Sequence, residues 1–124
     1  MEKKWIIAGA VFGFLSVAIG AFGAHSLKNV LDAYGRDIFH TAVLYQMFHS
    51  LALVGVGLVQ NIRKLPGLDI SGWCFAAGIV LFSGSLYLLA VTGIKSLGVI
   101  TPFGGLAFLF AWLWLFLEIM KDKK

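Results

Sequence analysis

This 124-residue chain has few charged residues and almost no cysteine or proline. Charged side chains make up 13% of the residues, about half the share in soluble domains. Hydrophobic residues make up 60%, and the mean hydropathy is +0.91. A soluble core of this length cannot hide so much apolar surface. The single cysteine, Cys74, excludes a disulfide within the chain. The composition therefore indicates an integral membrane protein.

Four apolar runs are each long enough to cross a bilayer. They cover about 5–24, 39–59, 72–91 and 103–119, and short segments between them carry most of the charges. The first run also suggests a signal peptide cleaved after Gly23, but it is longer than a typical signal-peptide core and three more runs follow. We therefore expect one membrane domain over residues 1–124, an all-α, polytopic bundle of four transmembrane helices.

Two connecting segments carry local signals of their own. Residues 25–38 combine apolar side chains at helical spacing with charged ones, which predicts a short amphipathic helix at the membrane interface. An ordered loop is the alternative. Thr101 and Pro102 are typical of a helix start, with threonine as N-cap and proline in the first helical position.

The basic residues are distributed unevenly between the two sides of the expected bundle. Four spans place both termini on one side, together with seven of the ten Lys and Arg residues. The positive-inside rule then predicts that both termini are cytoplasmic, in the cell membrane. Topology thus explains the net charge of +4, and nucleic acid is not an expected partner. The seven are Lys3, Lys4, Arg63, Lys64, Lys121, Lys123 and Lys124; Lys28, Arg36 and Lys95 fall on the other side.

The second apolar run carries a polar stripe, within Phe39–Leu53. Lipid cannot satisfy such side chains, so the stripe must face other helices. Helical spacing and depth place it near the bilayer midplane, level with two serines of the third run. The expected polar strip consists of Tyr45, Gln46, His49, Ser83 and Ser85.

Three interpretations of this polar strip remain open. It forms interhelical hydrogen bonds that fix helix register, it binds a small ligand or relays protons, or it pairs a serine with His49 as in a hydrolase. The sequence favours the first, and the absence of a GxSxG motif beside the serines argues against the third. The first run also lacks Asp and Glu, which disfavours a proton-coupled exporter of the small multidrug type. Glu118 is expected to pair with a lysine at the interface.

The remaining histidines fall at the outer rim of the bundle, where we expect a second polar cluster of His25, His40 and Thr101. His49 lies half a helix length away from it. No CxxC or HExxH motif is present, so we predict no metal site and no cofactor.

Small residues recur at spacings of three and four in the first run, which predicts a close helix contact along one seam. Glycines in the third and fourth runs are expected to pack in the same way. The expected packing residues are Gly9, Gly13, Ser16, Gly20, Gly23, Gly84 and Gly104.

Four blocks carry a resemblance to a known family: GAFGAHSL (20–27), TAVLYQMFHSLAL (41–53), LFSGSLYLL (81–89) and TPFGGLAFLFAW (101–112). Their order and spacing resemble the small four-helix membrane family of unknown function that includes the YgdD- and YwdK-type proteins (domain of unknown function 423, UPF0382). The resemblance implies a multi-pass membrane protein and brings no catalytic residue set. The matching positions are Gly20, Gly23, His25, Tyr45, Gln46, His49, Ser83, Gly84, Ser85, Thr101, Pro102, Gly104 and Gly105.

The sequence thus favours a non-enzymatic membrane protein that binds a partner or helps assemble a complex. The first alternative is a small transporter or a ligand- or lipid-binding unit that uses the strip around His49, and an intramembrane hydrolase is a remote one. Expected partners are the lipid bilayer and either a second copy of the chain or another membrane protein.

Overall fold

The computed structural model describes residues 3–123, and this part of the chain is helical with no strand. Its helices form four segments long and apolar enough to cross a membrane. The first is α1 (Lys4–His25) and the second is α2 (Ala33–Arg63). The third joins a short 3₁₀-helix (Pro66–Leu68), α3 (Asp69–Gly78), a π-helix (Ile79–Ser83) and α4 (Gly84–Thr92). The fourth joins a 3₁₀-helix (Lys95–Val99) to α5 (Thr101–Lys121). The all-α, four-span architecture predicted from the sequence is confirmed.

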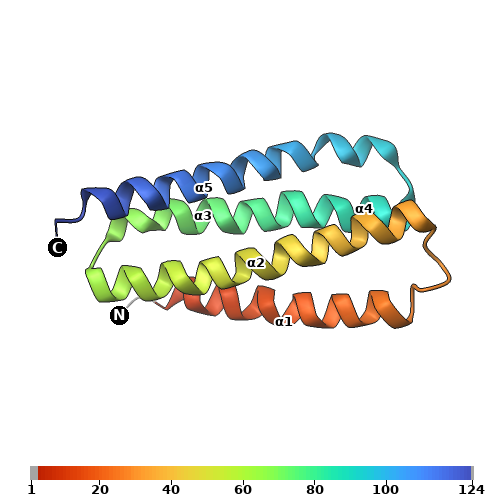
Figure 1. Ribbon diagram of the computed structural model, residues 1–124, viewed down its shortest axis with the longest axis horizontal. Helices are drawn as coiled ribbons and strands as arrows, with labels where there is room; N and C mark the ends of the chain where they lie inside the picture. The colour runs from red at the N-terminus through yellow and green to blue at the C-terminus, as the bar shows by residue number, and fades with distance from the viewer. Residues whose placement is uncertain (1–2, 124) are drawn as a thin grey trace.

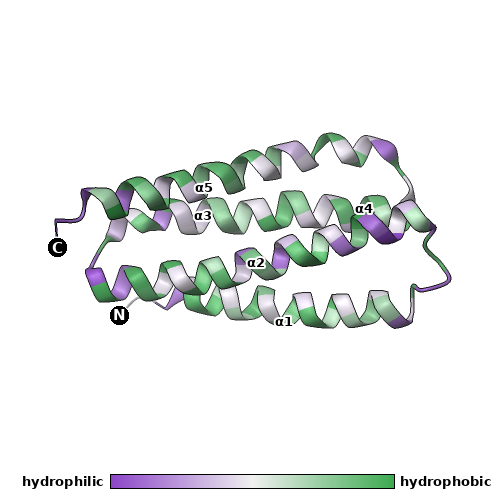
Figure 2. Cartoon of the chain, viewed as in Figure 1, coloured by the Kyte–Doolittle hydropathy of each residue, from purple (hydrophilic) through white to green (hydrophobic). Residues whose placement is uncertain are grey.

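The four segments run side by side, and neighbours along the chain are antiparallel (Figure 1). Helix α1 packs on α2, α2 packs on α3 and α4, and α5 packs on α3 and the π-helix. The start of α1 and the end of α5 lie at the same end of the bundle. Figure 2 shows hydrophobic residues along the length of all four segments and hydrophilic ones concentrated at the two ends. This is the hydropathy pattern of a multi-pass membrane protein.

The link between the first two spans differs from the expected amphipathic helix. Helix α1 continues to His25, and the next residues form turns and bends up to Asp32. The Asp32 carboxylate accepts a hydrogen bond from the Gly35 backbone N–H at 2.7 Å, so it caps α2. The second half of the segment is therefore the first turns of α2, which continues into the membrane. At 31 residues, α2 is about 46 Å long and exceeds the hydrocarbon thickness.

The start of α5 also differs from the expectation by one residue. The N-cap position belongs to Ile100, and Thr101 is the first helical residue. The Thr101 hydroxyl pairs with the Ser85 hydroxyl instead of capping its own helix. A hydroxyl partner on the neighbouring helix has replaced the local cap.

Small residues bring the first two helices into close contact along the expected seam. A Cβ atom added to Gly9 would lie 2.6 Å from the Ser50 carbonyl oxygen, and one added to Gly20 would lie 3.2 Å from Val43. One added to Gly23 would overlap the Phe39 ring. Gly13 has ordinary contacts with Ser50, and Ser16 is buried.

The other two expected packing glycines behave differently from each other. Gly104 lies against the backbone of Phe82, where a Cβ atom would overlap, so α5 approaches the π-helix closely at this point. Gly84 has no atom within 4 Å of its Cβ position and does not pack against another helix. The close contacts of the third span come instead from Gly72, against the Trp5 ring, and Gly78, against the Phe108 ring.

Candidate functional site

His49 lies inside the bundle with both ring nitrogens hydrogen-bonded. Its Nε2 accepts a hydrogen bond from Trp112 Nε1 at 3.1 Å, because an indole can only donate. The ring proton is therefore on Nδ1, which donates to the Tyr45 carbonyl oxygen at 2.7 Å. The imidazole also stacks on Phe108, with ring centroids 3.6 Å apart, and the residue is only 6% exposed. This geometry holds a neutral imidazole with no free nitrogen.

Gln46, one helical turn before His49, connects three helices. Its Nε2 donates to the Phe12 carbonyl oxygen of α1 at 2.9 Å. Its Oε1 accepts from the Tyr87 hydroxyl of α4 at 2.6 Å. The side chain is 3% exposed. Gln46 therefore ties α1 and α4 to α2 through two interhelical hydrogen bonds.

The serines bind backbone carbonyls rather than the imidazole. Ser83 Oγ donates to the Ala42 carbonyl oxygen at 2.7 Å, so it joins the π-helix to α2 one turn from Gln46. Ser85 Oγ lies 3.0 Å from the Phe82 carbonyl oxygen and pairs with Thr101 of α5. Ser85 is thus separated from the other members of the expected strip. With both of its nitrogens bonded elsewhere, His49 forms no pair with a serine.

Tyr45 forms the exposed side of the strip. Its ring packs on Phe82, with centroids 4.5 Å apart, and is 40% exposed. Together with Trp112 it borders an open apolar cleft of about 610 Å³ between α2 and α5. The remaining lining residues are His49, Phe82, Pro102, Gly105, Leu106, Phe108 and Leu109.

The expected outer-rim cluster does not gather around one centre. His25 ends α1 and is exposed, and His40 lies on α2 beside a small pocket of about 160 Å³ at the end of α1. Thr101 faces Ser85 instead of either histidine. Within residues 3–123, no three His, Cys, Asp or Glu side chains converge as metal ligands would.

A polar cluster centred on Asp69, which was not predicted from the sequence, lies at the end of the bundle where α1 begins. The Asp69 carboxylate accepts from Lys4 Nζ at 2.9 Å, from Trp5 Nε1 at 2.9 Å and from Gln60 Nε2 at 2.8 Å. It therefore joins the start of α1, the end of α2 and the start of α3. Two features of the sequence could have revealed this cluster. Asp69 is an isolated acid just before the third apolar run, and Lys4 and Trp5 stand at the start of the first run.

Other ion pairs close the same end of the bundle. Glu118 pairs with Lys121 at 2.9 Å, as predicted for the last turn of the fourth span. Arg63, at the end of α2, pairs with Asp122 at 2.6 Å. The indole of Trp114 donates to the Gly67 carbonyl oxygen at 3.0 Å. The Arg63 and Trp114 contacts hold the segment between α2 and α3 against the end of the fourth span, whereas the Glu118–Lys121 pair lies within α5.

Four apolar spans and polar side chains that hydrogen-bond across helix contacts define a polytopic integral membrane protein. Residues 19–105 match the family described as "Protein of unknown function (DUF423)", and the chain belongs to this family. It is 43% identical over 120 residues to the UPF0382 membrane protein YwdK of Bacillus subtilis (strain 168), covering 96% of this chain and 98% of that protein. The family resemblance seen in the sequence is confirmed.

Further relatives come from other bacteria. A UPF0382 membrane protein of Haemophilus influenzae is 40% identical over 124 residues, covering 99% of this chain and 98% of that protein. One of Staphylococcus haemolyticus is 43% identical over 119 residues, covering 96% and 97%. No solved structure matches the chain. The relatives' names establish a membrane protein and assign no reaction.

Proposed function

We propose that this protein is a non-enzymatic component of the cell membrane that binds a second copy of itself or another membrane protein through its lipid-facing surface. One observation carries the proposal: the polar groups at the middle of the bundle are hydrogen-bonded to one another or to backbone. Gln46 uses both ends of its amide, His49 both nitrogens and Ser83 its hydroxyl. Such a strip fixes helix register and offers no vacant position to a transported solute.

A small transporter would need a different arrangement at this depth. It needs a water-accessible path to the midplane and polar groups free to bind the solute. Within residues 3–123, the one buried side-chain nitrogen or oxygen without a hydrogen-bond partner is Oε1 of Gln60, near the end of α2. The buried polar atoms of Gln46, His49 and Ser83, near the midplane, all have hydrogen-bond partners. The geometry therefore favours a packed scaffold over a transport path.

Accessibility of Gln46 to water tests this distinction. In a Cys74→Ala background, Gln46→Cys should resist a water-soluble thiol reagent in intact vesicles. Lys95→Cys, at an exposed position that starts the 3₁₀-helix before α5, is the matched reactive control. Rapid labelling of Gln46→Cys would refute the packed strip and support the transporter.

The outer helices provide the surface for a partner. Phe14 on α1 is 72% exposed and Leu109 on α5 is 68% exposed, because these helices pack on the bundle along one side only. A photo-crosslinking residue at either position should give discrete protein adducts in cells. Co-expression of tagged and untagged copies of the chain shows whether an adduct joins two copies of this protein. Lipid adducts alone at both positions would contradict the proposal.

We further propose that both termini face the cytoplasm. In a four-span topology, seven of the ten Lys and Arg residues fall on the side of the two termini and three fall on the opposite side. The positive-inside rule assigns the side with more basic residues to the cytoplasm. Lys123→Cys and Lys95→Cys, each in the Cys74→Ala background, should react with an impermeant reagent from opposite faces, Lys95→Cys from outside. The reverse pattern would refute the orientation, and labelling on the same face would refute four spans.

The cleft beside His49 supports a second candidate, a unit that binds an apolar ligand or a lipid chain. Its volume of about 610 Å³ is within the range of small-molecule sites, and Trp112 and Tyr45 border it. Thermal unfolding in nanodiscs with a panel of lipids tests this candidate. A stabilisation lost in His49→Ala and Trp112→Ala would favour it, and equal loss of stability with no ligand response would favour the packed strip.

A further inference from the structure

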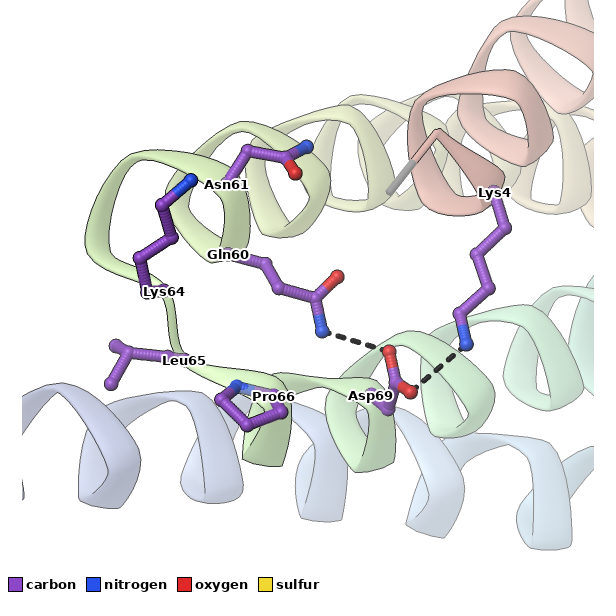
Figure 3. A pocket seen from close by; sticks show the side chains of 7 residues that line it. All are labelled: Lys4, Gln60, Asn61, Lys64, Leu65, Pro66 and Asp69. Atoms are coloured by element: carbon purple, nitrogen blue, oxygen red, sulfur yellow. Dashed lines mark hydrogen bonds and ion pairs between the residues drawn. The ribbon is translucent and has the colours of Figure 1, made fainter. Parts of the chain in front are cut away.

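A second pocket lies at the end of the bundle where α1 begins, away from the His49 cleft. It has a volume of about 390 Å³ and lies between the start of α1, the end of α2 and the turn that leads into α3. Its polar lining side chains are those of Lys4, Gln60, Asn61, Lys64 and Asp69 (Figure 3). None of the midplane hydrogen bonds of Gln46, His49 and Ser83 involves a residue that lines this pocket.

Gln60 brings an unsatisfied acceptor to the pocket. The side chain is 6% exposed, and its Nε2 donates to Asp69 Oδ1 at 2.8 Å. Its Oε1 has no hydrogen-bond partner. Rotating the amide would not help, because it would place that oxygen against the Asp69 carboxylate. The carboxylate therefore fixes the amide, and the free oxygen calls for a donor from an occupant.

The charges around Gln60 favour an anionic occupant. The Lys4 ammonium is paired with Asp69 at 2.9 Å. The Lys64 side chain also lines the pocket, is exposed, and makes no hydrogen bond or ion pair within residues 3–123. Two ammonium groups against one carboxylate leave the pocket with a net positive charge. In Figure 3, Lys64 and Lys4 lie on opposite sides of Gln60.

The backbone of Lys64 also suits glycine better than lysine. Lys64 is the C-cap of α2 and has φ of 56°, in the left-handed region that glycine or asparagine adopts with less strain. A lysine at this position places an ammonium group on the pocket at some cost in backbone energy. It also provides a variant, Lys64→Gly, that removes the ammonium while relieving the strain.

Tryptophans place this pocket at the depth of lipid headgroups. Trp5 donates to Asp69 and packs edge-on against Trp73, with ring centroids 5.0 Å apart. Trp114 bonds to the turn before α3. Tryptophan is enriched at the membrane–water interface, where one edge is apolar and the other is wet. An occupant of this pocket therefore lies among phosphates and headgroups of one leaflet.

We propose that this pocket binds the headgroup of an anionic phospholipid that carries a hydroxyl donor, the chemistry of phosphatidylglycerol. The phosphate oxygens accept from Lys64, and a headgroup hydroxyl donates to Gln60 Oε1. Phosphatidylcholine has the phosphate but no hydrogen-bond donor, so it can pair with Lys64 but leaves Gln60 Oε1 without a donor. The acyl chains extend beside the apolar surface of the bundle.

Lipid binding to the purified full-length protein tests this proposal. Native mass spectrometry and thermal unfolding in detergent compare dioleoyl phosphatidylglycerol, dioleoyl phosphatidylcholine and soluble glycerol phosphate. The wild type should bind phosphatidylglycerol more tightly than phosphatidylcholine. Lys64→Gly should fold normally and bind phosphatidylglycerol about fivefold more weakly, the equivalent of ~1 kcal/mol for one basic residue near an anionic surface. Lys95→Gly, at the opposite end, is the matched control and should bind as the wild type does.

Gln60→Met removes the unsatisfied oxygen and should abolish the preference for phosphatidylglycerol over phosphatidylcholine. Equal binding of the two lipids by the wild type, or unchanged binding by Lys64→Gly, would overturn the proposal. The same stabilisation by glycerol phosphate alone would also overturn it, because the pocket would then be a soluble-anion site.

Discussion

Replacing Gln46 by methionine keeps the length of the side chain and removes two interhelical hydrogen bonds, to Phe12 and from Tyr87. Such bonds between membrane helices contribute on average ~0.6 kcal/mol and at most ~1.7 kcal/mol each. Gln46→Met should therefore lower the free energy of unfolding by about 1–3 kcal/mol, twice the single-bond value. Tyr87→Phe removes one of the two bonds and keeps the ring contact with Phe39, so it should cost about half as much.

The double variant measures the bond between Gln46 and Tyr87 directly. Reversible unfolding in mixed micelles, or steric trapping in bicelles, gives the four free energies of the cycle. We expect a coupling energy of about 0.6–1.7 kcal/mol. Tyr34→Phe, at a tyrosine that is 63% exposed, should change nothing and serves as the control. A coupling energy below ~0.3 kcal/mol, within the usual additivity error, would refute the role of Gln46 as a link between α2 and α4.

Three further substitutions test separate contacts. Gly104→Ala should destabilise the protein by about 1–3 kcal/mol, because the added Cβ overlaps the backbone of Phe82 and α5 must move away. Gly84→Ala, in open space, should be neutral or stabilising by up to ~1 kcal/mol in the same unfolding assay, and a large loss of stability there would contradict the packing. Trp112→Phe leaves His49 Nε2 without its donor and should cost about 1–3 kcal/mol. The imidazole ¹⁵N chemical shifts report the Nδ1–H tautomer in the wild type, and an Nε2–H tautomer there would refute the assigned hydrogen bonds.

The sequence was sufficient for the number of spans, because apolar length alone reports a bilayer crossing. It also identified Gly9 and Gly104 as points of close approach, since a missing side chain at a helix contact leaves a pattern of small residues. Span boundaries were less accurate. Helix α2 begins six residues before the apolar run, at Ala33 rather than Phe39, because the Asp32 cap sets the helix start independently of hydropathy.

The partners of the polar strip were harder to predict than its members. Depth along the bilayer follows from counting residues, and it places Ser83 level with the part of α2 where its hydroxyl bonds to the Ala42 carbonyl, one turn before Gln46. The direction in which a side chain points around its helix depends on which helices are neighbours and on any irregularity in the helix. Counting alone therefore could not show that Trp112 bonds to His49, or that Ser85 faces α5.

The π-helix of the third span contains a residue that a regular helix would not need. The Gly84 backbone N–H bonds to the Ile79 carbonyl oxygen five residues back, so this turn holds one residue more than an α-helical turn. Deleting one residue between 79 and 83 would restore regular α-helical bonding locally. Because both kinds of turn bring the chain round about once, the residues after the deletion would keep nearly the same orientation relative to α3. Leu86 and Leu89 would then stay in the core they form with Ala42. A deletion from a regular turn of α4 would instead rotate every later residue of the helix by about 100°, one residue's share of a 3.6-residue turn. The third span is therefore expected to tolerate the loss of one residue at the π-helix better than a loss within its α-helical parts.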